Sequence, residues 1–67
     1  MAKIKLNGKI TKLRSKTSIL KLLKTHKLEK KKIAIELNGK ILQKSNYNKT
    51  ILKNMDTLEI VHFIGGG

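Results

Sequence analysis

The chain has 67 residues, and we expect one domain over residues 1–67 because so short a chain buries only a small core. It contains no cysteine, which excludes disulfides, thiolate-bound zinc and thiol catalysis. Sixteen basic residues against four acidic ones give a net charge of +12, and every basic residue except Arg14 is a lysine. Lysine is less suited than arginine to bidentate recognition, so the charge is compatible with a solvated surface and with an acidic partner.

Neither a spanning segment nor a leader is visible in the sequence. No apolar run approaches the roughly 18 residues that cross a bilayer. The first five residues alternate apolar and charged side chains, unlike a signal peptide. We therefore expect a cytoplasmic protein that does not enter membranes.

Turn signals and alternation predict a first hairpin. Residues 3–6 alternate polar and apolar side chains, and Asn7-Gly8 is the strongest short signal for a two-residue turn. The returning segment, residues 9–13, is ambiguous. A period of two places Ile10 and Leu13 on opposite faces, so the buried face stays open unless a bulge shifts the register.

A helix is predicted from Ser18 to Thr25 or His26. Ser18 or Thr17 suits the N-cap position, where a side-chain oxygen accepts from free backbone N–H groups. The apolar residues Ile19, Leu22 and Leu23 then follow the helical period.

The second half of the chain predicts more strands. Residues 33–37 alternate, Asn38-Gly39 predicts a second turn, and residues 40–43 return with Ile41 or Leu42 inward. Residues 44–54 are polar and irregular, with a short helical turn and anchors expected at Tyr47, Ile51 and Leu52. Residues 57–64 form the longest and most apolar strand, which we expect at the centre of the sheet.

This order of elements predicts an α+β fold. One amphipathic helix can bury its apolar stripe only by covering one face of a sheet. We therefore expect a β-grasp arrangement: a mixed sheet of four to five strands with one main helix packed on one face.

Few side chains are suited to catalysis. His26 and His62 lie on different predicted elements without metal-site spacing, and no pair of carboxylates shares a segment. We expect no metal site, no bound cofactor and no enzyme activity of the chain alone. The last three residues, Gly65-Gly66-Gly67, contribute nothing to a core. Because glycine has no side chain, this flexible tail presents an unhindered carboxylate on a thin peptide that fits a narrow channel.

Several segments together resemble the small sulfur carrier proteins of thiamin biosynthesis, a ubiquitin-like family. The resemblance covers the whole chain and is strongest in residues 56–67, which end in glycines. The Asn7-Gly8 hairpin, the helix and residues 33–39 agree with it. Two positions depart: Gln43-Lys44 stands where the family often has Pro-Arg, and Met55 stands where it often has Gly.

The resemblance implies a route for sulfur. An adenylating enzyme of the ubiquitin-activating type would use ATP to transfer AMP to the Gly67 carboxylate. A persulfide supplied through a cysteine desulfurase would displace AMP, and the resulting thiocarboxylate would donate sulfur to thiazole synthase. The carrier supplies the acyl group, and Gly65 and Gly66 supply the tail.

The strand period also predicts a docking surface. Leu58 and Ile60 face the helix, so the other face of the last strand is open. That open face carries an apolar patch rimmed by carboxylates, with these residues on the last strand and its neighbour: Ala34, Glu36, Glu59, Val61 and Phe63.

Three alternatives remain open from the sequence. The small subunit of molybdopterin synthase and a carrier for transfer-RNA thiolation share the fold and the tail chemistry. A small basic nucleic-acid-binding domain would explain the charge. It is disfavoured because Tyr47 and Phe63 are the only aromatic residues and Arg14 is the only arginine. The thiolated end product, the sulfur donor and the oligomeric state are not decided by the sequence.

Overall fold

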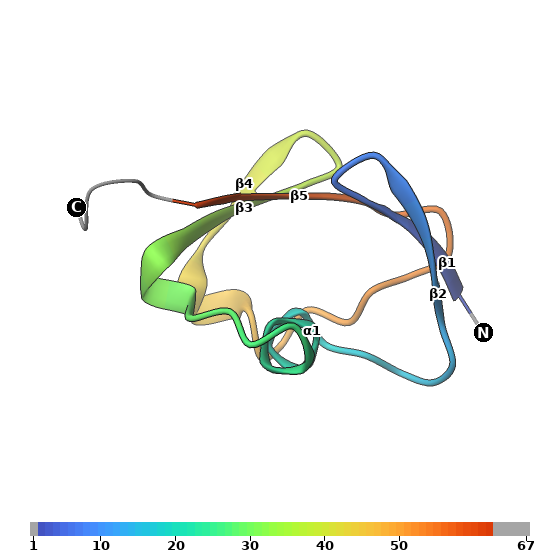
Figure 1. Cartoon of the computed structure of the whole chain (residues 1–67), viewed down its shortest axis with the longest axis horizontal. Coiled ribbons are helices and arrows are strands. Elements are labelled where there is room, and N and C mark those ends of the chain that lie inside the picture. The colour runs from blue at the N-terminus through green and yellow to red at the C-terminus, as the bar shows by residue number, and fades with distance from the viewer. Residues whose placement is uncertain (1, 63–67) are drawn as a thin grey trace.

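The computed structural model describes residues 2–62 of the chain. Five strands, one α-helix and two short 3₁₀ turns follow one another in this part (Figure 1). In chain order they are β1 (Ala2–Leu6), β2 (Lys9–Leu13), α1 (Ile19–Thr25), η1 (Lys30–Lys32), β3 (Ile33–Leu37), β4 (Lys40–Leu42), η2 (Lys44–Asn46) and β5 (Thr57–His62).

All five strands belong to one mixed sheet in the order β2-β1-β5-β3-β4. β5 pairs parallel with β1 and antiparallel with β3, and the two hairpins are antiparallel. The last strand therefore lies at the centre, which confirms the expectation from its length and apolar character.

The sheet and α1 form two layers, with α1 below the sheet in Figure 1. Side chains from both layers build one core, because the apolar stripe of the helix faces the apolar side of the strands. The α+β fold predicted from the sequence is thus confirmed. The buried core residues are Ile4, Leu13, Ile19, Leu22, Leu23, Ile33, Ile35, Tyr47, Leu52 and Leu58.

The helix begins where its cap was predicted. The Ser18 hydroxyl oxygen accepts a hydrogen bond from the backbone N–H of Lys21 at 3.1 Å. Ile19, Leu22 and Leu23 are all buried. With seven residues, α1 would be marginal alone, so its burial against the sheet supplies its stability. No helix in residues 2–62 is long and apolar enough to cross a membrane.

The pairing of β1 with β2 resolves the ambiguous strand. The register is one-to-one from Leu6↔Lys9 to Ala2↔Leu13, without a bulge. Leu13 is buried, while Ile10 lies on the other face and is 69% exposed. The bulge that would have brought both side chains inward is therefore not formed.

The crossing from β4 to β5 is anchored by two residues rather than three. Tyr47 and Leu52 are buried, but Ile51 is 39% exposed, so its expected anchoring role is wrong. Ile51 instead contacts the rest of the fold through its backbone, in an isolated bridge with Ser18. In the second hairpin Leu42 packs against the core and Ile41 is 78% exposed.

Candidate functional site

The two hairpin turns hold the start of β5 between them. Both turns have the sequence Asn-Gly with positive φ at both residues, the signature of a type I′ turn. The Asn7 side-chain oxygen accepts from the Ile60 N–H at 2.7 Å. The Asn38 side-chain oxygen accepts from the Thr57 N–H at 2.8 Å. Asparagine thus serves both the left-handed turn and the central strand.

The residues predicted to form the tail follow β5 in the sequence. Gly65, Gly66 and Gly67, and with them Phe63, lie outside the described residues. Their roles therefore stay predictions. The described part of β5 ends at His62, which is exposed.

The four other residues predicted for docking share the open face of the sheet. Register pairs Ala34 with Val61 and Glu36 with Glu59 directly across β3 and β5. Residues opposite each other on neighbouring strands point to the same face. Val61 is 54% exposed, and both glutamates are exposed.

A fifth residue, missed by the sequence argument, belongs to the same surface. Ile41 on β4 pairs with Glu36 and is therefore on the open face. The tight turn after Leu37 forces Leu37 opposite Lys40, which places Ile41 beside Glu36. This register was available from the two-residue turn. We call Ala34, Glu36, Ile41, Glu59 and Val61 the acid-rimmed patch.

The predicted core side of β5 is largely confirmed. Leu58 is fully buried, and Ile60 packs against the core at intermediate exposure. Leu58 pairs with Leu6 on one side and Leu37 on the other, so three leucines form a row under the sheet. β1 pairs with β5 only at Thr57 and Leu58, so Ile60 has a paired strand residue on the β3 side alone.

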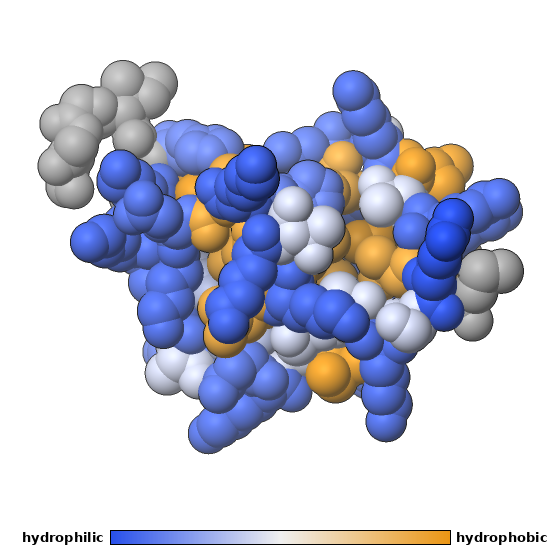
Figure 2. All heavy atoms as spheres, turned by 60° about the horizontal axis from the view of Figure 1, so that its bottom comes forward, coloured by the Kyte–Doolittle hydropathy of each residue, from blue (hydrophilic) through white to orange (hydrophobic). Residues whose placement is uncertain are grey.

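Charge is distributed unevenly over the molecule. Hydrophilic side chains project over much of the face shown in Figure 2, with apolar areas between them. The exposed residues of α1 include Lys21 and Lys24. Two of the four acidic residues, by contrast, lie side by side in the acid-rimmed patch. The one ion pair found in residues 2–62 is a surface contact of 3.8 Å between Lys32 and Glu29.

Within residues 2–62, no three histidine, cysteine, aspartate or glutamate side chains gather as metal ligands would. The one resolved pKa change in that range concerns Tyr47, where burial raises the pKa of the hydroxyl and a backbone hydrogen bond with Ile35 acts in the opposite direction. Tyr47 belongs to the core, so this pKa change concerns the core and not the open face of the sheet.

The comparisons agree with this architecture of a β-grasp body and a glycine end. The model of the ThiS family matches residues 4–67, including the three glycines. The chain is 40% identical over 65 residues to the sulfur carrier protein ThiS of Bacillus subtilis, covering 96% of this chain and 98% of that protein. The crystal structure of the thiamine biosynthesis protein ThiS from Geobacter metallireducens superposes with a TM-score of 0.81 at 28% identity, covering 97% of this chain and 99% of that one.

The chain therefore belongs to the ThiS family, the ubiquitin-like sulfur carrier proteins of thiamin biosynthesis. A second kind of relative is longer. Over 97% of this chain, the thiazole synthase of Magnetococcus marinus is 35% identical, and the matching segment makes up 20% of that protein. The chain thus corresponds to about a fifth of this relative's length.

Proposed function

We propose that this sulfur carrier holds its sulfur as a thiocarboxylate at Gly67. A carboxylate resists nucleophiles, because it is negatively charged and has no good leaving group. An adenylating enzyme overcomes this by joining the carboxylate oxygen to the α-phosphate of ATP, with release of pyrophosphate. A persulfide sulfur, supplied by a cysteine desulfurase, then attacks the acyl carbon and AMP leaves. Cleavage of the sulfur–sulfur bond by a thiol yields the thiocarboxylate. Splitting the transfer into such steps lowers each barrier.

The glycine end is the observation that supports this chemistry most strongly. The family match extends through Gly67, so the glycine end lies within the region that matches the sulfur carriers. Glycine lets the backbone pass through a channel too narrow for any side chain. The carrier needs no bound cofactor in this scheme, because the adenylating enzyme binds the ATP.

Thiazole synthase is the acceptor that the comparisons favour. In the Magnetococcus relative, a segment similar to this chain is part of a protein named thiazole synthase. A carrier and the enzyme that consumes its sulfur benefit from being held together, since tethering raises their effective concentration. This favours delivery to thiazole formation over molybdopterin synthesis or transfer-RNA thiolation.

The acid-rimmed patch is the surface by which we expect the partners to dock. Glu36 and Glu59 face each other across β3 and β5, an arrangement that costs stability because like charges repel. The chain has fifteen lysines available and yet places no ion-pairing lysine on these two carboxylates within residues 2–62. Negative charge kept beside exposed Val61 and Ile41 fits a partner surface that presents basic side chains around an apolar centre.

Intact-mass measurement tests the proposal. The chain is incubated with ATP, the adenylating enzyme of the same organism and a persulfide donor. We expect the mass change that replaces one oxygen by sulfur, and we expect none when a few residues are added after Gly67. An extended chain that still acquires the sulfur mass would contradict the proposal.

Gly66→Ala sharpens the same experiment. The added Cβ should slow thiolation, because it crowds a passage that admits bare backbone. Thermal melting is the control, and we expect no change in it because the substitution lies beyond β5.

A further inference from the structure

Met55 is unusual both in its backbone conformation and in the exposure of its side chain. Its φ is +75°, in the left-handed region that favours glycine, and its side chain is 80% exposed. It is the third residue of a four-residue turn closed by a hydrogen bond from the Asp56 N–H to the Lys53 carbonyl at 3.1 Å. A type II turn has this pattern and usually carries glycine at that position. A large apolar side chain held there against its backbone preference points to a function.

The turn that carries Met55 is fixed on both sides. The Met55 N–H donates to the Lys3 carbonyl at 2.7 Å, and the Asn54 side chain accepts from the Lys3 N–H at 2.9 Å. Asp56 accepts from the Lys53 N–H at 2.7 Å and from the Asn38 side chain at 3.0 Å. Met55 is therefore presented from a rigid turn rather than from a loose loop.

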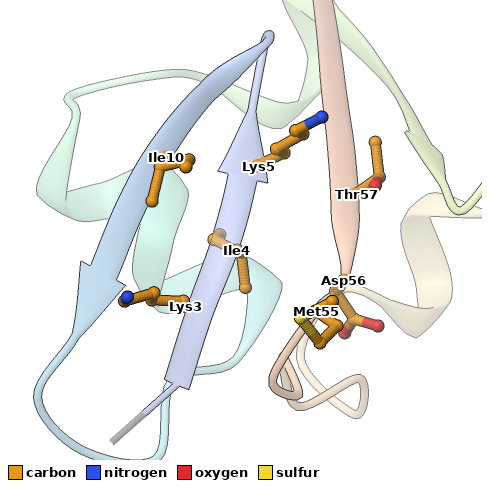
Figure 3. Close-up of a pocket in the computed structure, with 7 residues that line it drawn as sticks. All are labelled: Lys3, Ile4, Lys5, Ile10, Met55, Asp56 and Thr57. Atoms are coloured by element: carbon orange, nitrogen blue, oxygen red, sulfur yellow. The ribbon is translucent and has the colours of Figure 1, made fainter.

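Met55 lines a cleft of about 250 Å³ together with residues of β1 and β2. Figure 3 shows the cleft between Ile10 on β2, Lys3 and Lys5 on β1, and the turn that leads into β5. Ile10 is 69% exposed on the open face of the sheet. The cleft thus presents two exposed apolar side chains, Ile10 and Met55, to a binding partner.

The charge around this cleft is positive. Lys3 and Lys5 line it, and Lys12 lies opposite Lys3 on β2. None of these lysines forms an ion pair within residues 2–62. The only carboxylate in the wall is Asp56, and both of its oxygens already accept hydrogen bonds. An occupant that brings carboxylates is therefore the one that fits.

We propose that this cleft, the Met55 cleft, binds an acidic segment of a partner protein that inserts one apolar side chain between Ile10 and Met55. Carboxylates on either side of that apolar residue meet Lys3 and Lys5. The proposal rests on charge complementarity, which gives both the attraction and the orientation of the segment. It extends the proposed function, because a carrier that must meet several partners gains a second point of contact.

The Met55 cleft and the acid-rimmed patch differ in place and in charge. Thr57 borders the cleft and Val61 belongs to the patch, so about 13 Å of β5 separates them. A second copy of this chain is a weaker occupant. Its acid-rimmed patch has the right signs, but two bodies of charge +12 repel each other as they approach.

The test is a titration of the full chain with a synthetic peptide, followed by the backbone amide signals in NMR at low salt. The probe carries one central leucine with two glutamates on each side. Two matched peptides replace the leucine by serine or the glutamates by lysines. We expect the leucine–glutamate peptide to shift the signals of Lys3, Lys5, Ile10, Met55 and Thr57. We expect the serine peptide to bind about tenfold more weakly, because it lacks one buried apolar side chain.

Two matched substitutions separate this cleft from the rest of the surface. Ile10→Thr and Ile41→Thr change exposed isoleucines that follow identical Leu-Asn-Gly-Lys segments. Only Ile10→Thr should weaken the binding of the leucine–glutamate peptide, by about tenfold. Met55→Gly should weaken it to a similar degree while the melting temperature stays equal or rises, because glycine suits a φ of +75°.

Several results would overturn the proposal. These are equal effects of the two threonine variants, equal binding of the serine peptide, signal shifts centred on Lys30–Lys32, or Met55→Gly lowering stability without changing binding. A dimer in sedimentation that Ile10→Thr disrupts would assign the cleft to a second copy instead. Thiolation of Gly67 is not measured in any of these steps, so failure here is distinct from failure of the carrier chemistry.

Discussion

The two hairpins contain the same five-residue segment but differ in the charge of their surroundings. Leu-Asn-Gly-Lys-Ile occurs at residues 6–10 and again at residues 37–41. In both copies the asparagine has a left-handed backbone, with φ of 49° and 53°, and bonds to β5. In both copies the isoleucine is exposed on the open face of the sheet.

The hairpins differ in the charge that surrounds this shared segment. Lys5 precedes the first copy and Glu36 precedes the second. The first half of the open face accordingly carries Lys3, Lys5 and Lys12, and the second half carries Glu36 and Glu59. The repeated segment thus sets turn and register, whereas its flanking residues set the charge of each half.

The largest expected effect on the free energy of unfolding comes from truncating Leu58, which pairs with both copies of the segment. Leu58 lies between the leucines of both, paired with Leu6 and with Leu37, and is fully buried. Leu58→Ala should lower the free energy of unfolding by roughly 2–5 kcal/mol. Ile60→Ala should cost less, because Ile60 is partly exposed. Urea denaturation measures both, and a larger loss for Ile60→Ala would show that the faces of β5 are assigned wrongly.

The two asparagines allow the copies to be compared directly. Asn→Gly keeps the left-handed turn and removes only the side-chain hydrogen bonds. Asn38→Gly loses bonds to Thr57 and Asp56, so we expect a cost of about 2 kcal/mol in the free energy of unfolding. Asn7→Gly loses the bond to Ile60, and we expect about 1 kcal/mol. Equal losses in denaturation would mean that the Asp56 contact adds nothing.

These roles show where sequence reasoning succeeds and where it stops. The Asn-Gly turns, the helical period and the alternation of β5 are local signals, so they predicted the elements and the central strand. The face of β2 depends on its pairing with β1. The two-residue turn sets that register only if no bulge follows it, so Ile10 and Leu13 stayed unassigned. Ile51 has the composition of an anchor, but the crossing path decides its exposure.

The candidate site likewise contains residues that the sequence predicted and residues that it did not. Val61, Glu59, Ala34 and Glu36 were placed on one face by the strand period alone, and the sheet register agrees. Ile41 was missed because a three-residue strand carries too little alternation to show its face. The left-handed backbone of Met55 was not predicted, although glycine, the residue that suits a positive φ, is what the family often has at this position. The repeated pentapeptide was not recognised as a repeat from the sequence, and repetition alone does not reveal the asparagine bonds.

The second hairpin has a further tie that the first lacks. The Tyr47 hydroxyl forms a hydrogen bond with the backbone of Ile35 on β3, and burial raises the pKa of the hydroxyl above its ordinary value of about 10. The folded state then binds the tyrosine proton more tightly than the unfolded state, so this contribution is present below pH 10 and is lost as pH rises beyond it. The stability difference between the native chain and Tyr47→Phe should therefore narrow above pH 10. A difference that stays constant in denaturation at high pH would contradict this assignment.

The smallest expected effect concerns a positively charged segment that belongs to neither hairpin. Lys30, Lys31 and Lys32 form η1 and are exposed. Replacing all three by glutamine should slow association with an acidic partner at low salt and change little at high salt, because exposed charges are screened over about 8–10 Å at physiological ionic strength. Stopped-flow mixing with the adenylating enzyme measures the rates. Equal rates at low salt would mean that this lysine run does not steer docking.

Affinity for the adenylating enzyme tests the account most directly, because it separates the docking surface from the reactive end. Calorimetric titration compares Val61→Asp, in the acid-rimmed patch, with Gly66→Ala, in the tail. We predict that Val61→Asp melts like the native chain and binds at least about tenfold more weakly, since it brings a further charge into a contact that excludes water. Gly66→Ala should bind nearly as well as the native chain and form little thiocarboxylate. Unchanged affinity of Val61→Asp, together with lost affinity of Gly66→Ala, would show that the tail alone is recognised and would contradict the account.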